Sequence, residues 1–399
     1  MAPEVGVHAL GSTTQVLLWF KGTVLSNSWK TRAHSASGDY REGETESMTD
    51  GKHGIRAGAR VALALAAAWV LGAGAASAAE VTALAIMLPE EPTDFGWNQQ
   101  AFVAAKTVAA KYHLKFTPAS GLGYGDVRSE LRELADDGAS LIIAHASGYN
   151  TAAPEIGAEK HVPVAIVDRP KDSRPGAVAD YTLSGREGAY LAGVLAGKTT
   201  RTRVVAIVVA AESPPWNTQS AAFAQGVRAT QPGVKLLYAV IGPAAYADVA
   251  GGRRVTETAI GAGADVIFGQ GDRASFGMLQ AVETKQSING GKVWFIDQIG
   301  DKSSIDKGHL LSSVIWNLVP VYSAMIEDLK AGKFGTHPYA IQLSDDSVRL
   351  LHSKYIPDDV WSGIESVRTQ IVGGKLKVDP IWDALSVRAM MTSVAAPPK

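Results

Sequence analysis

Aromatic, acidic and amide side chains recur directly after apolar, strand-like segments, where they could bind a small planar molecule. The segment 89–99, PEEPTDFGWNQ, follows such a run and carries these side chains into the start of a helix. Aromatic rings stack on flat rings or sugar faces, while carboxylates and amides hydrogen-bond to hydroxyls and ring nitrogens. The ligand-binding residues that we predict on this basis are Asp94, Trp97, Asn98, Tyr149, Asn150, Trp216, Tyr246, Gly269, Gly271, Asp297 and Trp316.

Local structural roles compete with ligand binding at several of these positions. Asp94 could cap the helix that follows it, and Trp97 could pack into the core. Asp168 and Arg169 follow another apolar segment, and they fit ligand contacts and an internal ion pair equally well. These alternatives stay open at the level of sequence.

The chain carries no signature of catalysis or of a metal site. It has no Cys, which excludes disulfides, thiol catalysis and thiolate metal ligands. No G-x-S-x-G elbow, P-loop or H-E-x-x-H motif occurs, and Gly269 to Gly271 lack the spacing of a dinucleotide fingerprint. His145 has no companion ligand nearby. We therefore predict no catalytic residues, no metal and no cofactor, and the net charge of −1 argues against nucleic acid as a partner.

Apolar segments alternate with helical ones along most of the chain. Strands that are apolar throughout are typical of parallel sheets covered by helices on both faces. The segment 134–144 is similar to 259–269, which indicates two α/β halves in series. The fold class that we predict is α/β, with two doubly wound parallel-sheet lobes joined by a hinge. The predicted strands are 81–88, 114–118, 141–144, 163–167, 204–210, 234–240, 266–268, 293–296 and 310–315.

The expected mature chain, of roughly 320 residues, exceeds what one hydrophobic core usually supports. We expect an N-terminal lobe from residues 79–199 with 300–335. We expect a C-terminal lobe from residues 200–299 with 336–385, and a flexible tail at 386–399.

The N-terminal region has the three parts of a secretory signal. Basic residues precede an apolar run that starts at Val61, and Ala76-Ser77-Ala78 forms a small-residue cleavage site. We predict a signal peptide over 48–78, with Met48 as the true start and 1–47 as an artefact of the start site. A buried helix or a membrane anchor is the alternative. The prediction is a protein exported to the periplasm.

Two exported α/β lobes without catalytic motifs match the plan of a periplasmic solute-binding protein. Such lobes close about a hinge around a small-molecule ligand. Ligands of open α/β sheets bind beyond the carboxyl ends of the strands, where the side chains named above are expected. We expect a monomer.

Several of these residues resemble one family, the basic membrane protein (BMP) family of purine nucleoside receptor-like ABC transporter solute-binding proteins. The resemblance extends over about 81–378. Its motifs are similar to Asp94 with Trp97-Asn98, Gly148-Tyr149, Tyr246-x-Asp248-x-x-x-Gly252, Gly269-Gln270-Gly271, Asp297 and the segment 312–317. The resemblance implies a purine nucleoside or nucleobase-like ligand, an inner-membrane ABC permease as partner, and contact of Asp297 with a ribose.

Two departures from that family weaken the case for a nucleoside. Ala152-Ala153 stand where nucleoside-binding relatives have an Asp, and Trp316 stands where they have a Lys. A base without ribose or another planar heterocycle therefore remains open.

Other functions also fit a two-lobed binding fold. A ligand-sensing module docked on a membrane receptor would have the same lobes, as would a binding protein for a non-purine solute such as a sugar. A nucleoside hydrolase would need an Asp cluster near the N-terminus, and the first strand ends instead in Leu88-Pro89-Glu90-Glu91. A sugar-responsive transcription regulator would need a helix-turn-helix in place of the export signal.

Overall fold

Short runs of small and β-branched apolar residues form two mainly parallel sheets. The computed structural model describes residues 80–393, so the predicted signal segment 48–78 lies outside the described residues. β1 (Ala83–Met87), β3 (Leu141–Ala144) and β4 (Val164–Val167) are buried along their whole length. They are apolar throughout because helices cover both faces of their sheet.

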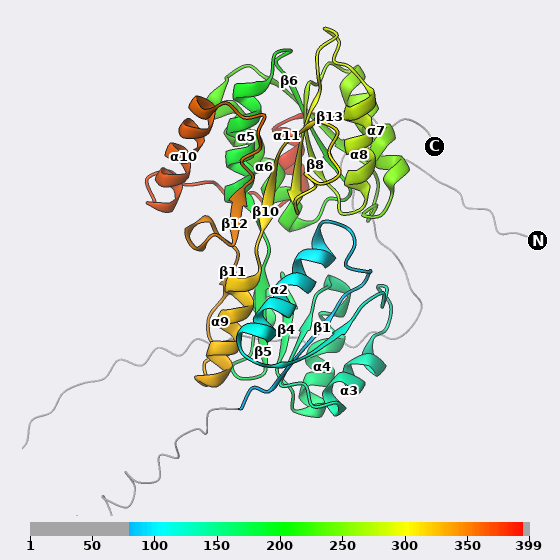
Figure 1. Ribbon diagram of the computed structural model, residues 1–399, viewed down its shortest axis with the longest axis vertical. Helices are drawn as coiled ribbons and strands as arrows, with labels where there is room; N and C mark the ends of the chain where they lie inside the picture. The colour runs from blue at the N-terminus through cyan, green and yellow to red at the C-terminus, as the bar shows by residue number, and fades with distance from the viewer. Residues whose placement is uncertain (1–79, 394–399) are drawn as a thin grey trace, which may run out of the picture. The chain divides into compact units, whose positions relative to one another are not determined.

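The first sheet has the strand order β11-β5-β4-β3-β1-β2, and all its pairs are parallel. Alternate residues of β1 and β3 belong to two separate cores, one on each face of the sheet. Helices α2 and α9 pack together on one face, and α3 and α4 on the other (Figure 1). The remaining elements of this lobe are β2 (Lys115–Ala119), β5 (Val178–Thr182), β11 (Tyr339–Ala340), α2 (Trp97–Lys111), α3 (Arg128–Asp136), α4 (Ala152–Lys160), α9 (Val319–Lys330), η1 (Ser147–Tyr149) and η2 (Pro170–Asp172).

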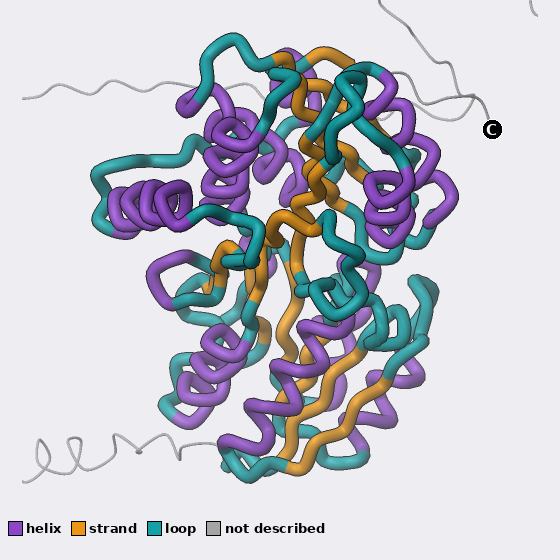
Figure 2. Tube along the Cα trace, turned by 45° about the horizontal axis from the view of Figure 1, so that its top comes forward, coloured by secondary structure: helices purple, strands orange, loops and turns teal. Residues whose placement is uncertain are grey.

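The second sheet has the order β12-β10-β9-β8-β6-β7-β13, in which only β12 runs antiparallel to its neighbour within the described chain. Helices α5 and α6 cover one face, and α7 and α8 cover the other (Figure 1). Its strands are β6 (Val204–Val209), β7 (Lys235–Val240), β8 (Val266–Gln270), β9 (Trp294–Ile299), β10 (Leu310–Trp316), β12 (Val348–Leu350) and β13 (Thr392–Ser393). Its helices are α5 (Arg186–Thr199), α6 (Pro214–Thr230), α7 (Val249–Gly261), α8 (Ala274–Thr284), α10 (Asp358–Val372), α11 (Ala384–Ala389) and the short η3 (Leu343–Asp345). The tube in Figure 2 shows strands flanked by helices in both lobes.

Glycine allows the backbones of α5 and α6 to touch. A Cβ at Gly193 would overlap the carbonyl of Phe223, and a Cβ at Gly226 would overlap the carbonyl of Tyr190. Since each glycine faces the backbone of the opposite helix, the two helices approach more closely than side chains would allow.

The chain crosses between the lobes three times within the described residues. The crossings are 183–185 between β5 and α5, 317–318 between β10 and α9, and 341–347 between β11 and β12. Three short connections between two lobes are the usual place for a hinge in two-lobed proteins.

The distribution of elements between the lobes differs from our expectation in three places. β10, expected with the N-terminal lobe, pairs with β9 in the second sheet, whereas β11 pairs with β5 in the first sheet. α5, also expected in the N-terminal lobe, packs on α6. The physical reason is that both sheets need short apolar strands of the same kind, so the local pattern does not say which sheet a strand joins.

The C-terminal segment also differs from the flexible tail that we expected from residue 386. Val387 is fully buried, and β13 extends the second sheet beside β7. Residues 394–399 lie outside the described part. Among helices of residues 80–393, none combines the length and apolar character needed to cross a membrane.

Candidate ligand-binding site

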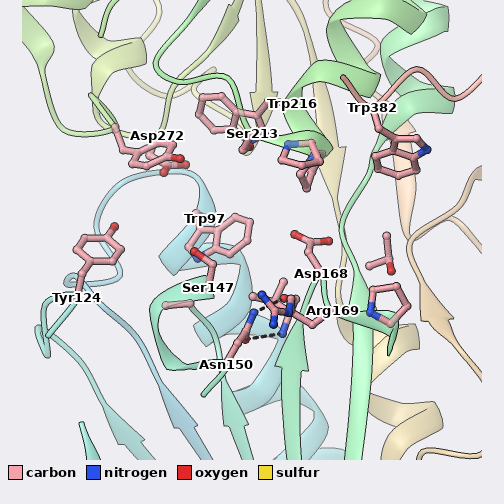
Figure 3. Close-up of a pocket in the computed structure, with 17 residues that line it drawn as sticks. Trp97, Tyr124, Ser147, Asn150, Asp168, Arg169, Ser213, Trp216, Asp272 and Trp382 are labelled. Carbon is pink, nitrogen blue, oxygen red and sulfur yellow. Dashed lines mark hydrogen bonds between the residues drawn. The ribbon is translucent and has the colours of Figure 1, made fainter. Parts of the chain in front are cut away.

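The carboxyl ends of strands from both sheets border one cavity of about 630 Å³. The first lobe contributes residues that follow β1, β2, β3 and β4, and the second contributes residues that follow β6, β7 and β8. Figure 3 shows these side chains converging from the two lobes. The cavity therefore lies where open parallel sheets bind ligands.

Trp97, the first residue of α2, forms an aromatic surface of the cavity on the first lobe. Its indole Nε1 donates a hydrogen bond to the carbonyl of His145 over 3.1 Å, and its ring lies on the His145 imidazole with centroids 4.3 Å apart. The Trp316 ring meets it edge-on at 6.2 Å. These contacts hold the indole in one orientation.

Asp94 and Asn98 belong to the structure beneath this wall and do not line the cavity. The Asp94 carboxylate accepts hydrogen bonds from the backbone N–H groups of Gly96, Asn98 and Gln99 and from Asn98 Nδ2. Both residues are buried. Asp94 therefore binds the N–H groups at the start of α2, which is the local role that the sequence left open.

Asn150 and Tyr149 follow β3 but have different surroundings. Asn150 lines the cavity and holds the end of β4, because its Nδ2 donates to the Val167 carbonyl over 2.8 Å. Tyr149 is fully buried and donates its hydroxyl to the Gly123 carbonyl over 2.6 Å. Tyr149 thus braces the loop after β2 and lies outside the cavity wall.

Trp216 and Tyr246 form the opposite wall on the second lobe. Trp216 sits in the first turn of α6, which begins with Pro214-Pro215, and Tyr246 lies in the loop after β7. Their rings meet edge to face at 5.3 Å. Proline at a helix start suits the fixed backbone there and holds the loop that carries Trp216.

Gly269 and Gly271 serve packing beneath the second wall. A Cβ at Gly269 would lie 2.5 Å from the Phe295 ring and 2.7 Å from the Met278 sulfur. A Cβ at Gly271 would press on Met278 at 3.0 Å and on Ala274 at 3.2 Å. Both glycines let α8 pack closely on β8, and neither lines the cavity.

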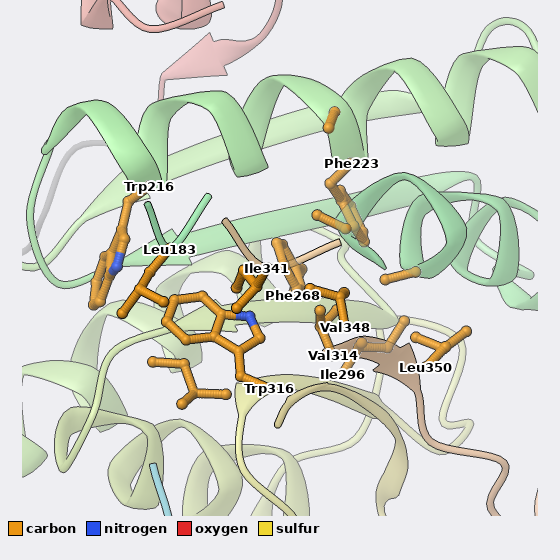
Figure 4. Packing of buried hydrophobic residues seen from close by; sticks show 14 of the residues in the cluster. Leu183, Trp216, Phe223, Phe268, Ile296, Val314, Trp316, Ile341, Val348 and Leu350 are labelled. Carbon is orange, nitrogen blue, oxygen red and sulfur yellow. The ribbon is translucent and has the colours of Figure 1, made fainter. Parts of the chain in front are cut away.

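Asp297 and Trp316 are buried behind the site. Asp297 pairs with Lys302 Nζ over 2.5 Å, and both side chains are about 1% exposed. Burial raises the pKa of Asp297 although the Lys302 ammonium opposes that shift. Trp316 lies in the interior near Leu183 and Ile341, as Figure 4 shows. Neither residue lines the cavity. Trp316 affects the cavity only indirectly, through its ring contact with Trp97.

Thirteen of the seventeen residues that line the cavity were absent from our predicted set, and four of these carry aromatic or acidic side chains, namely Tyr124, Asp168, Asp272 and Trp382. Asp168 directly follows a predicted strand and Asp272 lies four residues after another, so the strand-end rule could have found them. Tyr124 lies five residues past β2, farther than that rule reaches. Trp382 precedes α11 in a segment that returns to the cavity from the far end of the chain, and no local pattern indicates this.

Asp168 and Arg169 both line the cavity, but they have different partners. Arg169 forms an ion pair with Asp172 over 3.0 Å, whereas Asp168 accepts a hydrogen bond from the Leu183 N–H over 2.8 Å. Burial raises the pKa of Asp168 to about 7. Its backbone adopts φ of 55°, a left-handed conformation that is uncommon for residues other than glycine.

Side chains of the two lobes also contact each other outside the cavity lining. Arg273, before α8, pairs with Glu90 over 3.0 Å, and its guanidinium also donates to Thr93 Oγ1. Phe95 meets Phe276 edge-on at 6.2 Å. We call Glu90, Phe95, Arg273 and Phe276 the interlobe clamp. These contacts link the two lobes directly.

In the described part of the chain, no three His, Asp or Glu side chains gather in a group that could hold a metal ion. The cavity instead combines aromatic faces with carboxylate, amide and hydroxyl groups. Such a lining is able to bind and orient a small molecule.

Comparison with known proteins identifies a family match over most of the chain. Residues 81–380 match the Bmp family, described as ABC transporter substrate-binding protein PnrA-like. A CD4+ T-cell-stimulating antigen of Listeria monocytogenes is 28% identical over 54% of this chain, and the match spans 62% of that protein's length. An ABC transporter nucleoside-binding protein, BmpA, of Lactococcus lactis is 22% identical over 71% of this chain and 85% of its own.

Solved structures share the two-lobed architecture. A solute-binding protein of an ABC transporter system from Conexibacter woesei has a TM-score of 0.63 at 19% identity, over 76% of this chain and all of its own. Another from Aeropyrum pernix has a TM-score of 0.65 at 17% identity, over 77% and 96%. These likenesses concern the fold alone, and they confirm the predicted class of two α/β lobes of the type I periplasmic binding protein kind.

Proposed function

The chain belongs to the family of PnrA-like ABC transporter substrate-binding proteins, and on this premise we propose that it captures a small planar solute between its lobes. The solute would be a purine nucleoside or a nucleobase-like compound, and the closed lobes would present it to an inner-membrane permease. We further propose that it acts as a monomer in the periplasm, where the predicted signal segment 48–78 would deliver it. The name of the Lactococcus relative is consistent with such a ligand.

The observation that carries this proposal is the pairing of aromatic walls across the cavity. Trp97 comes from the first lobe and Trp216 with Tyr246 from the second. A cavity of about 630 Å³ falls within the range that holds small ligands. A flat ring bound between walls from both lobes favours closure, because it contacts both walls only when the lobes meet.

A thermal-shift screen of bases, nucleosides and sugars tests this function, since a ligand that binds only the folded protein raises its melting temperature. Nucleobases or nucleosides should raise it, and sugars should not. A response to sugars alone would mean that the ligand is a sugar and not a nucleoside or nucleobase. A folded protein that responds to no compound would contradict the proposal.

Replacing Trp97 by Ala should weaken binding of the best compound from that screen by at least about tenfold. Loss of a stacked ring removes about 1 kcal/mol beyond the lost buried area, and about 1.4 kcal/mol is a factor of ten in affinity. Isothermal titration calorimetry measures the change.

Trp361→Ala is the matched control for this substitution. Trp361 lies in α10, stacked on His352 and outside the cavity wall. Affinity should be unchanged in this variant. Equal affinities in Trp97→Ala and the wild type would remove Trp97 from the site.

Replacing Arg273 by Ala should raise the rate constant of ligand dissociation about two- to fivefold. The ion pair with Glu90 is partly exposed, so its contribution is at most about 1 kcal/mol. Stopped-flow tryptophan fluorescence would measure the rate. Arg253→Ala, which removes an ion pair with Glu257 inside α7, should leave the rate unchanged. An unaltered rate in Arg273→Ala would show that the interlobe clamp does not hold the ligand in place.

A further inference from the structure

Two carboxylates line the cavity without a cation to neutralise them. Asp168 projects from the first lobe after β4, and Asp272 from the second lobe after β8 (Figure 3). Over residues 80–393, neither forms an ion pair. Asp272 Oδ1 is buried and has no hydrogen-bond donor among the described groups. An unpaired carboxylate out of water is costly unless a bound group satisfies it.

The charges near Asp272 do not supply that partner. Lys302 acts on it from a distance but is paired directly with Asp297. Asp94 and Glu90 add further negative charge nearby. Burial, together with these acidic neighbours, raises the pKa of Asp272 well above its usual range.

The surroundings of Asp168 are similarly acidic. Asp180 is a second carboxylate close to it and contributes to its raised pKa. Arg169 is the one cationic side chain in the described lining of the cavity, and it is exposed and paired with Asp172. Within the described lining, the two acidic side chains therefore have no cationic partner, and a positively charged ligand would favour their ionised forms.

Aromatic rings surround these carboxylates. The electron-rich faces of such rings attract cations, most strongly where water is excluded. The rings that line the cavity are those of Trp97, Tyr124, Trp216, Tyr246 and Trp382. A neutral planar ligand would stack here but would leave the carboxylates unpaired.

We propose that the solute of this protein is an organic cation, a flat ring that bears or adjoins a positively charged nitrogen placed near Asp168 or Asp272. This inference rests on the proposed function and narrows its ligand class. The aromatic walls provide stacking, and the two carboxylates, one from each lobe, select for charge.

Matched pairs of compounds test the inference, because the members of each pair differ by one methyl group and a positive charge. The pairs are nicotinamide with 1-methylnicotinamide and adenosine with 1-methyladenosine. Calorimetry with the mature protein at pH 7.5 should show that the cationic member of at least one pair binds at least tenfold more tightly. Asp168→Asn and Asp272→Asn keep the shape of the side chain and should each reduce that ratio severalfold. Asp301→Asn, an exposed aspartate outside the cavity lining, should leave it unchanged.

Equal or tighter binding of the neutral members would overturn the inference while leaving the proposed function intact. A ratio that both Asn variants preserve would overturn it as well, since the preference would then arise elsewhere. If none of the four compounds binds the folded protein, the inference fails for these ring systems. The thermal-shift screen then decides the proposed function separately.

Discussion

Replacing Lys302 by Met should lower the free energy of unfolding by about 3–5 kcal/mol, the usual effect of leaving one member of a buried ion pair alone. Lys302 and Asp297 are both almost fully buried, with Nζ and the carboxylate 2.5 Å apart. Without the ammonium, the Asp297 carboxylate would lie in the core with no opposite charge. It would have to take up a proton or remain charged in an apolar environment, and both reduce stability near neutral pH. Urea denaturation at pH 7 measures the change.

The double variant Asp297→Leu/Lys302→Met is the control for this prediction. Replacing both members of a buried ion pair by apolar groups of similar size is often close to neutral, so the double variant should regain most of the lost stability. A single variant as stable as the wild type would mean that the pair does not stabilise the fold.

The substitution Asp297→Asn tests whether Asp297 has a structural role or binds the ligand. The family resemblance implied contact with a ribose, yet Asp297 lies outside the cavity lining. If Asp297→Asn lowered ligand affinity without altering stability, the ribose role would be favoured after all.

The sequence predicts the sheets well because strands buried on both faces must be apolar throughout. Every strand that we predicted overlaps an observed one, from β1 to β10. We did not predict β5, because Asp180 and Thr182 interrupt its apolar pattern. We also did not predict β11, β12 and β13, which are only two or three residues long. Brief edge strands have too few residues to show a period.

Residues at strand ends divide into those that face the cavity and those that hold the loop. Trp97, Asn150, Trp216 and Tyr246 line the cavity, as their positions after strands indicated. Asp94, equally close to a strand end, turns back to bind the N–H groups of its own helix. Sequence position places a residue at the correct edge of the sheet, but the direction of its side chain depends on the local backbone.

Contacts between distant segments set the remaining part of the site. Trp382 reaches the cavity because the segment before α11 returns across the second lobe, where the Asn217 amide donates to its carbonyl over 2.9 Å. That contact joins residues 165 positions apart in the chain. No window of sequence contains such information.

Acid should destabilise this protein through His145, a buried histidine that supports the aromatic wall. The side chain is fully buried. Its Nδ1 lies 2.7 Å from the Tyr181 hydroxyl and 3.4 Å from the Tyr322 hydroxyl, and its ring carries Trp97. Burial lowers the pKa of His145 to about 3, although the Trp97 contact and Asp94 oppose the shift.

The direction of the effect follows from which state binds the proton. The unfolded chain has a histidine pKa of about 6.5, so the unfolded state binds a proton at this residue below that pH. The folded state binds that proton only near pH 3, so acid favours unfolding. The His145 contribution to stability is therefore complete above about pH 6.5 and is lost progressively as the pH falls. Between pH 7 and pH 4.5 the loss amounts to about 2–3 kcal/mol.

The variant His145→Gln isolates this contribution, because glutamine cannot take up a proton in this range. Asp168 and Asp272 have raised pKa values and act in the opposite direction, so the absolute pH dependence of either protein mixes several groups. Subtracting the pH-dependent change in unfolding free energy of the variant from that of the wild type cancels the contributions of these shared groups. Urea denaturation at pH 7 and at pH 4.5 should show that the variant loses about 2–3 kcal/mol less than the wild type on acidification. His352→Gln, at an exposed position outside the core, should keep the wild-type pH dependence. Equal losses in His145→Gln and the wild type would mean that the folded state accepts a proton at this site. His145 would then not be held neutral beneath Trp97.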